Sequence, residues 1–257
     1  MDDNPPIPAA TLIVMRQAAA GFAEILVVER TMKMAFAGGA IVFPGGRVDP
    51  ADVALAQALD RPGDAARISA IRETIEESAV LAGVRSAGAL APQRSVDPVL
   101  GPMLQAELIA GAALGPLLAA HGLELDLDAL TLFARWMPAF KQARRFDTLF
   151  FLAEALPGTW DPQPQPGECE SARWTSAAAV LDRIAAGIDH AIFPTKRNLE
   201  RLARFASIDE ARADAARYPH DAIVPWIEQR GGEAHVCIPE DHGYPCTSEP
   251  MTTAIRA

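Results

Sequence analysis

"RETIEESAVLAG", residues 72–83, places one arginine and three glutamates in a segment otherwise rich in alanine and aliphatic side chains. On a helix that turns about 100 degrees per residue, the apolar side chains around this segment fall on one stripe. They are Ile68, Ile71, Ile75 and Ala79. Glu73, Glu76 and Glu77 then point together to the opposite side. Carboxylates this close destabilise a helix by about 0.2–0.5 kcal/mol per pair, and a bound divalent cation would offset that repulsion.

A solvent-exposed helix face would carry the same three glutamates, and this interpretation stands beside the metal site. Two neighbouring features favour the site. Arg72 can hold a carboxylate through two parallel hydrogen bonds and so fix the cluster. Upstream, residues 39–46, GAIVFPGG, end a strand in a proline-glycine turn that lets the backbone approach another group closely.

The segments before the glutamates predict the start of a sheet and then a helix. Residues 11–17 and 23–30 are short β-branched runs typical of a hairpin or of two neighbouring strands, and residues 39–43 predict a third strand. Residues 47–63 predict a loop with a short helix in its middle. Asp64 is then a suitable N-cap for a helix that runs to about residue 81.

After the glutamates the pattern changes several times. Residues 84–130 are rich in alanine, leucine, glycine and proline, and we interpret them as a helical insertion. Strands are predicted at 130–138, 146–156 and 171–176, with a proline- and glutamine-rich loop at 157–167. Residues 175–217 are strongly helical in pattern. The tail from 218 carries Trp226, Ile227 and Tyr244, which we expect to anchor it along the body.

Composition excludes several classes of protein. The 257 residues carry a net charge of −10, which disfavours binding to nucleic acid or to an anionic membrane, and half of them are hydrophobic, which is enough for a large core. Three scattered cysteines fit ordinary thiols in a reducing compartment. The first residues, MDDNPPIPAATLIVM, fit neither a signal peptide nor a membrane span, so we expect a cytoplasmic protein.

The residues around the glutamates resemble the box of the Nudix hydrolases, which reads G, five residues, E, seven residues and then REUxEExGU, with U aliphatic. The matching positions are Gly46, Arg72, Glu73, Glu76, Glu77 and Val80. Asp52 stands where the box has glutamate, Thr74 replaces an aliphatic residue, and Ala79 replaces the glycine at which the helix ends. Residues 53–71 make a spacer of nineteen residues, which costs little closure entropy if it lies in a surface loop.

The resemblance implies an α/β fold of the α+β kind, a mixed β-sheet sandwiched between helices. The Nudix domain would span 8–217 with its insertion at about 84–130, and a helical C-terminal extension would lead to a tail, 218–257, packed on the domain. Residues 25–46 also resemble the signature upstream of the box in coenzyme A diphosphatases, with Arg30 ending a strand before Phe43, Gly45 and Gly46. This branch implies cleavage of coenzyme A or acyl-coenzyme A to 3′,5′-ADP and (acyl-)4′-phosphopantetheine.

The resemblance also implies roles for individual residues. Glu73, Glu76 and Glu77 would hold Mg²⁺ or Mn²⁺ together with a backbone carbonyl near Gly45 or Gly46, and Arg72 would orient them. Glu168 is a candidate extra ligand or general base, although an exposed loop acid is the simpler interpretation. The expected substrate-binding residues are Arg30, Phe43, Gly45, Gly46, Arg144 and Arg145, since guanidinium groups suit the phosphates of a nucleotide.

Other substrates and other roles also fit these residues. The box specifies a diphosphate, so ADP-ribose or NADH would also serve as the small-molecule substrate. A catalytically silent Nudix module that binds a nucleotide or a protein is another class, which the three retained glutamates disfavour. The apolar insertion at 84–130 could form the wall of an acyl or pantetheine pocket, but such a stripe is more often part of a core or a dimer face, so a homodimer is one outcome. Lys196 and Arg197 are interpreted as the charged start of a helix.

Overall fold

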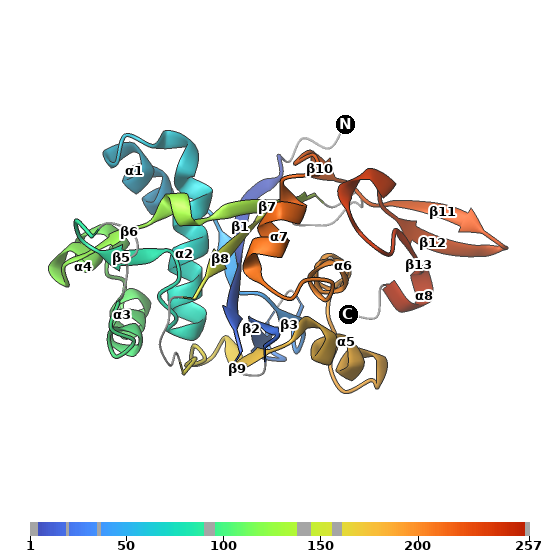
Figure 1. Cartoon of the computed structure of the whole chain (residues 1–257), viewed down its shortest axis with the longest axis horizontal. Helices are drawn as coiled ribbons and strands as arrows, with labels where there is room; N and C mark the ends of the chain where they lie inside the picture. The colour runs from blue at the N-terminus through green and yellow to red at the C-terminus, as the bar shows by residue number, and fades with distance from the viewer. Residues whose placement is uncertain are drawn as a thin grey trace.

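The computed structural model of the protein describes residues 5–18, 21–34, 37–89, 96–137, 145–155 and 161–254. Within these ranges eight strands form one mixed sheet in the order β10-β7-β8-β1-β2-β3, with β4 beside β1 and β9 beside β2 (Figure 1). The strands are β1 (Ile7–Gln17), β2 (Ala23–Arg30), β3 (Ile41–Val42), β4 (Gly45–Arg47), β7 (Thr131–Trp136), β8 (Phe146–Glu154), β9 (Cys169–Thr175) and β10 (Ala222–Ile223).

Strand β1 is the centre of the sheet because it is apolar on both faces. Leu12 and Val14 belong to one buried cluster, and Ile13 and Met15 belong to a second cluster on the other face. A strand buried on both sides appears in sequence as a continuous apolar run, as this one does. On one edge β1 pairs in parallel with β8, and on the other it pairs first with β4 and then with β2.

Helices cover both faces of the sheet, so the predicted mixed sheet between helices is confirmed (Figure 1). One side carries α1 (Pro50–Ala58), α2 (Ala65–Ser78), α3 (Leu100–Ile109) and α4 (Leu114–Ala120). The other side carries α5 (Ala177–Ala185), α6 (Phe193–Leu202) and α7 (Ile208–Ala215). None of the helices in the described ranges combines the length and apolar character needed to cross a bilayer.

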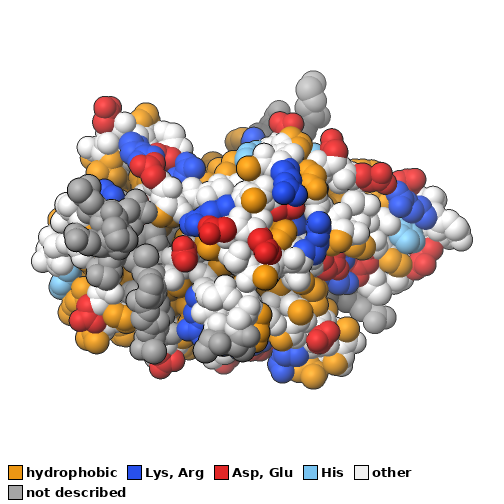
Figure 2. All heavy atoms as spheres, viewed as in Figure 1, with side chains coloured by type: hydrophobic (Ala, Val, Ile, Leu, Met, Phe, Trp, Pro, Cys, Tyr) orange, Lys and Arg blue, Asp and Glu red, His pale blue; other side chains and the backbone are white. Residues whose placement is uncertain are grey.

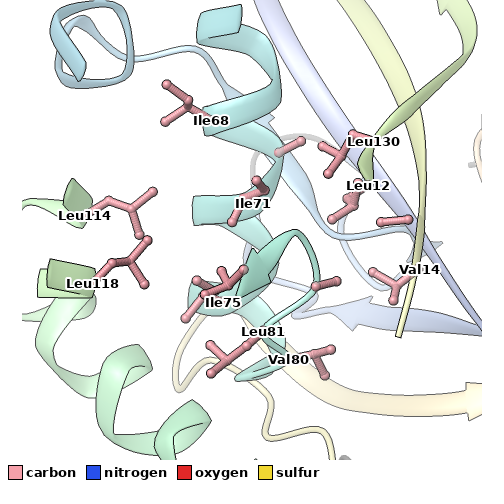
Figure 3. Close-up of a cluster of buried hydrophobic side chains, with 14 of the residues drawn as sticks. Leu12, Val14, Ile68, Ile71, Ile75, Val80, Leu81, Leu114, Leu118 and Leu130 are labelled. Atoms are coloured by element: carbon pink, nitrogen blue, oxygen red, sulfur yellow. The ribbon is translucent and has the colours of Figure 1, made fainter. Parts of the chain in front are cut away.

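The predicted apolar stripe of α2 lies in the first cluster. Figure 3 shows Ile68, Ile71 and Ile75 between Leu114 and Leu118 of α4 on one side and the sheet on the other. All three isoleucines are fully buried, and each such burial contributes about 1.5–3 kcal/mol to folding. The helix ends at Ser78 and not near residue 81, because Ala79 adopts the left-handed conformation with φ of 59°.

The insertion contains the predicted helices and also a small two-stranded sheet of β5 (Val84–Ser86) and β6 (Leu123–Leu125). The sequence-based interpretation missed these strands because three residues give too few alternations to recognise. Three short 3₁₀ turns complete the described elements: η1 (Pro62–Asp64), η2 (Leu127–Ala129) and η3 (Glu240–His242).

The tail contributes β10 to the main sheet and forms a second sheet of its own. This second sheet has the order β11-β12-β13 and consists of β11 (Trp226–Arg230), β12 (Glu233–Cys237) and β13 (Ser248–Pro250), followed by α8 (Met251–Ala254). Tyr244 is buried and accepts a hydrogen bond from the Trp136 indole at 3.0 Å, as expected of an anchor. Trp226 and Ile227 are 41% and 45% exposed, so the expectation that they anchor the tail was wrong.

Candidate active site

The proline-glycine turn lies directly against the carboxylates of α2. Strand β4 places Gly45 and Gly46 opposite Thr11 and Ala10 of β1. A Cβ atom at Gly45 would come within 2.5 Å of the Ala10 carbonyl oxygen, and one at Gly46 would overlap the Glu73 carboxyl group. The Gly45 amide donates a hydrogen bond to Glu77 Oε2 at 3.0 Å. Only glycine fits this close approach, which explains the two glycines of the turn.

Arg72 holds the acidic residues in place. Its Nε and Nη2 donate to the two oxygens of Asp52, each at 3.0 Å, so the pair is bidentate. Its Nη1 lies 2.9 Å from Glu73 Oε1 and donates to Glu76 Oε2 at 3.0 Å. Burial alone would lower the pKa of Arg72, but the hydrogen bond to Asp52 and the charges of the glutamates raise it, so the guanidinium stays charged. Asp52, which takes the place of the box glutamate, therefore reaches Arg72 despite its shorter side chain.

The same aspartate ties α1 to this site. Asp52 is 2% exposed and also accepts a hydrogen bond from the Asp49 amide at 2.9 Å, which caps the N-terminus of α1. The nineteen-residue spacer holds most of α1, η1 and the first half of α2. Its two ends are joined by the Asp52–Arg72 pair, so the long spacer leaves the geometry of the cluster intact.

The carboxylates of α2 are strongly desolvated. Burial raises the pKa of Glu77 to about 8, and the nearby Glu73 adds to this, while Arg30 and the Gly45 amide act in the opposite direction. Burial likewise raises the pKa of Glu73 to about 7 against the lowering effect of Arg72. Burial also raises the pKa of Glu76. The solvent-exposed helix face is therefore excluded as the interpretation of these residues.

This donor set suits a hard divalent cation. Carboxylate and carbonyl oxygens are the preferred ligands of such ions, and the like charges of neighbouring carboxylates help to raise the pKa values of Glu73 and Glu77. Among the described residues no group of three or more His, Cys, Asp or Glu side chains is gathered as a metal site. The guanidinium groups account for the present positions, since Arg72 contacts Glu73 and Glu76, and Arg30 lies 3.6 Å from Glu77.

The segment that precedes β9 closes the C-terminal end of α2. The amide of Gln163 donates to the Ser78 carbonyl at 2.8 Å. The side chain of Gln105, from α3, donates to the Glu76 carbonyl at 2.9 Å and to the Gln163 carbonyl at 2.8 Å. Gln105 escaped the sequence analysis, although an amide in the apolar helix LGPMLQAELI is the signal that could have revealed it.

Glu168 lies at the end of the same segment. Its carbonyl accepts a hydrogen bond from the Thr31 amide at 2.8 Å, directly after Arg30. Its side chain is exposed, yet its charge helps to raise the pKa values of both Glu76 and Glu77. Cys169, the next residue, is buried, and burial followed by the charge of Glu77 raises its pKa to about 12. The fold thus brings Glu168 and a thiol that the sequence did not single out to the edge of the cluster.

The other predicted substrate-binding residues are placed differently. Arg30 points at Glu77, as described above. Phe43 is buried in the second cluster, so its side chain packs in the core rather than at the surface near the glutamates. Arg145 precedes β8, where its carbonyl accepts a hydrogen bond from the Ile7 amide, and in the described ranges no contact links its guanidinium to the glutamates. Arg144 lies outside the described residues.

Lys196 and Arg197 lie in the first half of α6, as the predicted charged helix start requires, but Arg197 is buried. This arginine is 1% exposed and donates to Glu249 Oε2 at 2.9 Å and to Glu200 Oε1 at 2.6 Å. Both residues therefore belong to the contact between α6 and the tail, since Lys196 also pairs with Glu249.

Solved structures resemble this chain. A NUDIX hydrolase from Alicyclobacillus acidocaldarius is 34% identical in sequence and matches 82% of this chain and 97% of its own length with a TM-score of 0.68. A MutT protein from Methanosarcina mazei Go1 matches 79% of this chain and 97% of its own, at 13% identity and a TM-score of 0.43. No protein-family model matches the chain, and no curated protein matches it.

Proposed function

The chain belongs to the Nudix hydrolases and is a Nudix diphosphohydrolase, and from this premise we propose that its substrate is coenzyme A or an acyl-coenzyme A. The products would be 3′,5′-ADP and 4′-phosphopantetheine or its acyl form. The observation that carries the assignment of the site is the buried glutamate cluster on α2 beside the Gly45–Gly46 turn.

The substrate is supported by the residues upstream of the box. Arg30 ends β2 and lies beside Glu77, with its Nε buried and without a hydrogen-bond partner. A guanidinium held this way, next to the carboxylates that would hold the cation, suits a phosphate group of the nucleotide. Coenzyme A carries a diphosphate and a 3′-phosphate and so needs several such cations. The resemblance of residues 25–46 to coenzyme A diphosphatases points to the same substrate.

We assign the cation to Glu73, Glu76 and Glu77, with a backbone carbonyl near Gly46. A bound Mg²⁺ or Mn²⁺ would neutralise charge on the diphosphate and make a water molecule more acidic. Arg72 is a positioning residue, because it touches Asp52, Glu73 and Glu76 and leaves no donor directed at a substrate. Its role is to keep the glutamates at fixed positions while the charge around them changes.

In the reaction water attacks a phosphorus atom of the diphosphate, the bridging P–O bond breaks, and the departing phosphate monoester keeps the bridging oxygen. Glu168 is our candidate for the group that accepts the proton of this water, since it is exposed at the edge of the cluster. A buried carboxylate could not exchange protons with solvent as readily.

The test is release of 3′,5′-ADP from coenzyme A and a medium-chain acyl-coenzyme A with Mg²⁺ or Mn²⁺, beside ADP-ribose and NADH. Glu77→Gln should lower kcat/KM on the order of a thousandfold, as expected when a metal ligand is removed. Glu107→Gln, an exposed glutamate on α3, is the matched control and should leave activity unchanged. Cleavage of ADP-ribose or NADH alone would overturn the coenzyme A assignment and leave the site intact. Binding of coenzyme A without hydrolysis of any of these compounds would overturn both the proposed substrate and the proposed catalytic role of the glutamates.

A further inference from the structure

The β11–β12 hairpin extends from the body of the protein as an arm (Figure 1). Its turn is Gly231–Gly232, with φ of 60° and 89°, which is the two-residue type I′ turn that joins twisted strands. All five residues of β11 are exposed, including Trp226 and Ile227. Figure 2 shows acidic, basic and histidine side chains close together at this end of the molecule. A projecting strand with exposed aromatic and charged residues is a typical interaction surface.

One edge of β11 carries unpaired backbone groups. In a two-residue hairpin the closing residues, here Arg230 and Glu233, exchange both of their hydrogen bonds. By alternation Trp226, Glu228 and Arg230 direct their amides and carbonyls to β12, whereas Ile227 and Gln229 direct theirs away from it. In the described ranges β11 pairs with β12 alone. The groups of Ile227 and Gln229 therefore face an open edge.

We infer that this edge pairs antiparallel with the same edge of a second copy of the chain, with Gln229 opposite the partner's Gln229. In this register Glu228 lies opposite the partner's Arg230, and Arg230 lies opposite the partner's Glu228. Both side chains are about half exposed and form an intrachain pair at 3.1 Å, and Arg230 Nη1 also donates to Ser248 Oγ at 3.1 Å. Pairing would turn this contact into a network of four charges. It would also join the two three-stranded sheets into one continuous sheet.

The charges of Glu228 and Arg230 favour this register, and they favour a second copy of the chain as the binding partner. Sliding the pairing by two residues sets Ile227 opposite the partner's Gln229 and brings Glu228 opposite the partner's Glu228, which is unfavourable. A two-fold interface needs a surface complementary to itself, and the alternating Glu228 and Arg230 provide one. Trp226 would lie beyond the partner's turn and near the partner's Arg230, a cation on which an aromatic ring can stack.

The test uses two charge reversals, E228R and R230E, in the full chain. Wild type should sediment at twice the chain mass of 27.4 kDa. Each reversal alone places like charges opposite each other and should raise the dimer dissociation constant about tenfold or more. An equimolar mixture of the two variants restores opposite charges at every position and should recover the dimer. The intrachain pair is exposed, so neither variant should lose its fold, and the thermal unfolding midpoint checks this.

Gln229→Pro gives an independent measurement, because it removes the amide that points to the open edge and leaves the ladder to β12 intact. It should produce a monomer, while Glu107→Arg, a charge reversal on α3, should not. The inference is overturned if wild type is monomeric, if the single reversals stay dimeric, or if their mixture fails to associate. Capture of a different protein by wild type and by both reversals alike would also overturn it.

Discussion

Glu73 and Glu77 owe their raised pKa values first to burial and then to a neighbouring carboxylate, which is Glu76 for Glu73 and Glu73 for Glu77. Their pKa values of about 7 and about 8 compare with an ordinary value of 4.5. Two arginines, Arg30 and Arg72, face four carboxylates here, so the cluster would carry excess negative charge if all four carboxylates were ionised. A divalent cation relieves this excess, and protons relieve it when the cation is absent.

Stability of the metal-free protein should therefore fall as pH rises. Because the folded pKa values exceed the unfolded one, the folded state binds more protons between pH 4.5 and about 8. The contribution of the two groups is complete below pH 4.5 and is lost as pH rises through 7 to 8. We expect the Tm in a chelator to fall on the order of 5 °C between pH 5.5 and 8.5, measured by circular dichroism.

Two comparisons test whether the titration of these glutamates causes the fall in Tm. Glu77→Gln removes one of the titrating groups and should flatten the profile. Addition of Mg²⁺ at pH 8.5 should recover the loss in wild type, because metal binding replaces the protons. A Tm in chelator that rises steadily from pH 5.5 to 8.5 would contradict the argument.

Asp52 should act on metal affinity through Arg72. Asp52→Asn keeps the shape but removes the charge that holds the guanidinium, so Arg72 would be drawn further onto Glu73 and Glu76. We expect about a tenfold rise in the Mg²⁺ concentration for half-maximal activity, with a smaller change in kcat at saturating metal. Asp60→Asn, an exposed acid of the same spacer, should change neither. Equal effects of the two variants on metal dependence would exclude this role.

At the scale of elements, helix α2 is held by its apolar stripe and by its C-terminal end. The stripe was predictable because a long helix repeats its pattern several times. Asp64 lies at the predicted N-cap position, but its side chain makes no cap hydrogen bond and pairs with Arg61 and Arg67. The end was less predictable. Ala79 adopts a left-handed conformation that favours glycine, and the carbonyls of Glu76 and Ser78 find donors in Gln105 and Gln163, which are distant in sequence. Long-range partners of this kind leave no local pattern.

Helix α3 reaches these carbonyls because Gly101 allows a close approach. A Cβ at Gly101 would overlap the backbone oxygen of Ala79, which cannot turn aside. Gly101→Ala should lower the free energy of unfolding by about 1–3 kcal/mol, measured by urea denaturation. Gly115→Ala in α4 is the matched control, since its nearest neighbour is Leu55 Cδ1 at 2.7 Å, which can move. A loss at Gly115 as large as that at Gly101 would contradict this account.

At the scale of the whole molecule, α6 joins the sheet to the tail through buried polar groups. Arg201 is 1% exposed, donates to Asp214 at 2.8 Å and stacks on Phe133 at 4.2 Å. Tyr244, from the tail, donates to Asn198 Oδ1 at 2.8 Å. The segment FPTKRNLERL is so rich in charge that a surface helix was the natural interpretation. Burial of paired arginines depends on partners that the sequence places elsewhere, so this part of the molecule was not predictable.

Only part of the candidate site was predictable, because some of its residues are brought together by contacts between distant segments of the sequence. Glu73, Glu76, Glu77 and Arg72 share one helix, and their spacing alone brought them together. Arg30 and Glu168 came from other segments, and only the pairing of β2 with β9 brings their backbones together. The division of the chain at residue 217 stays a prediction.

Removing one partner of the buried Arg201–Asp214 ion pair should destabilise the whole protein. Asp214→Ala leaves Arg201 charged in the core and should cost about 3–5 kcal/mol in the free energy of unfolding. Arg201→Met combined with Asp214→Leu should recover most of this loss, because no charge is then left unpaired. Arg212→Met, whose ion pairs are exposed, should cost less than about 1 kcal/mol. Additive losses in the double variant would show that the pairing is not the cause.

The spacer between Asp52 and Arg72 begins and ends at the same hydrogen-bonded pair, and it reaches the surface at η1, which has no buried residue. Gly63, within it, is exposed and has open space where a side chain would project. A peptide inserted after Gly63 would hang from the outside of the molecule without pulling on the glutamates. Gly63 is therefore a suitable insertion site for attaching the enzyme to a support or for adding a fluorescent label close in sequence to the active site.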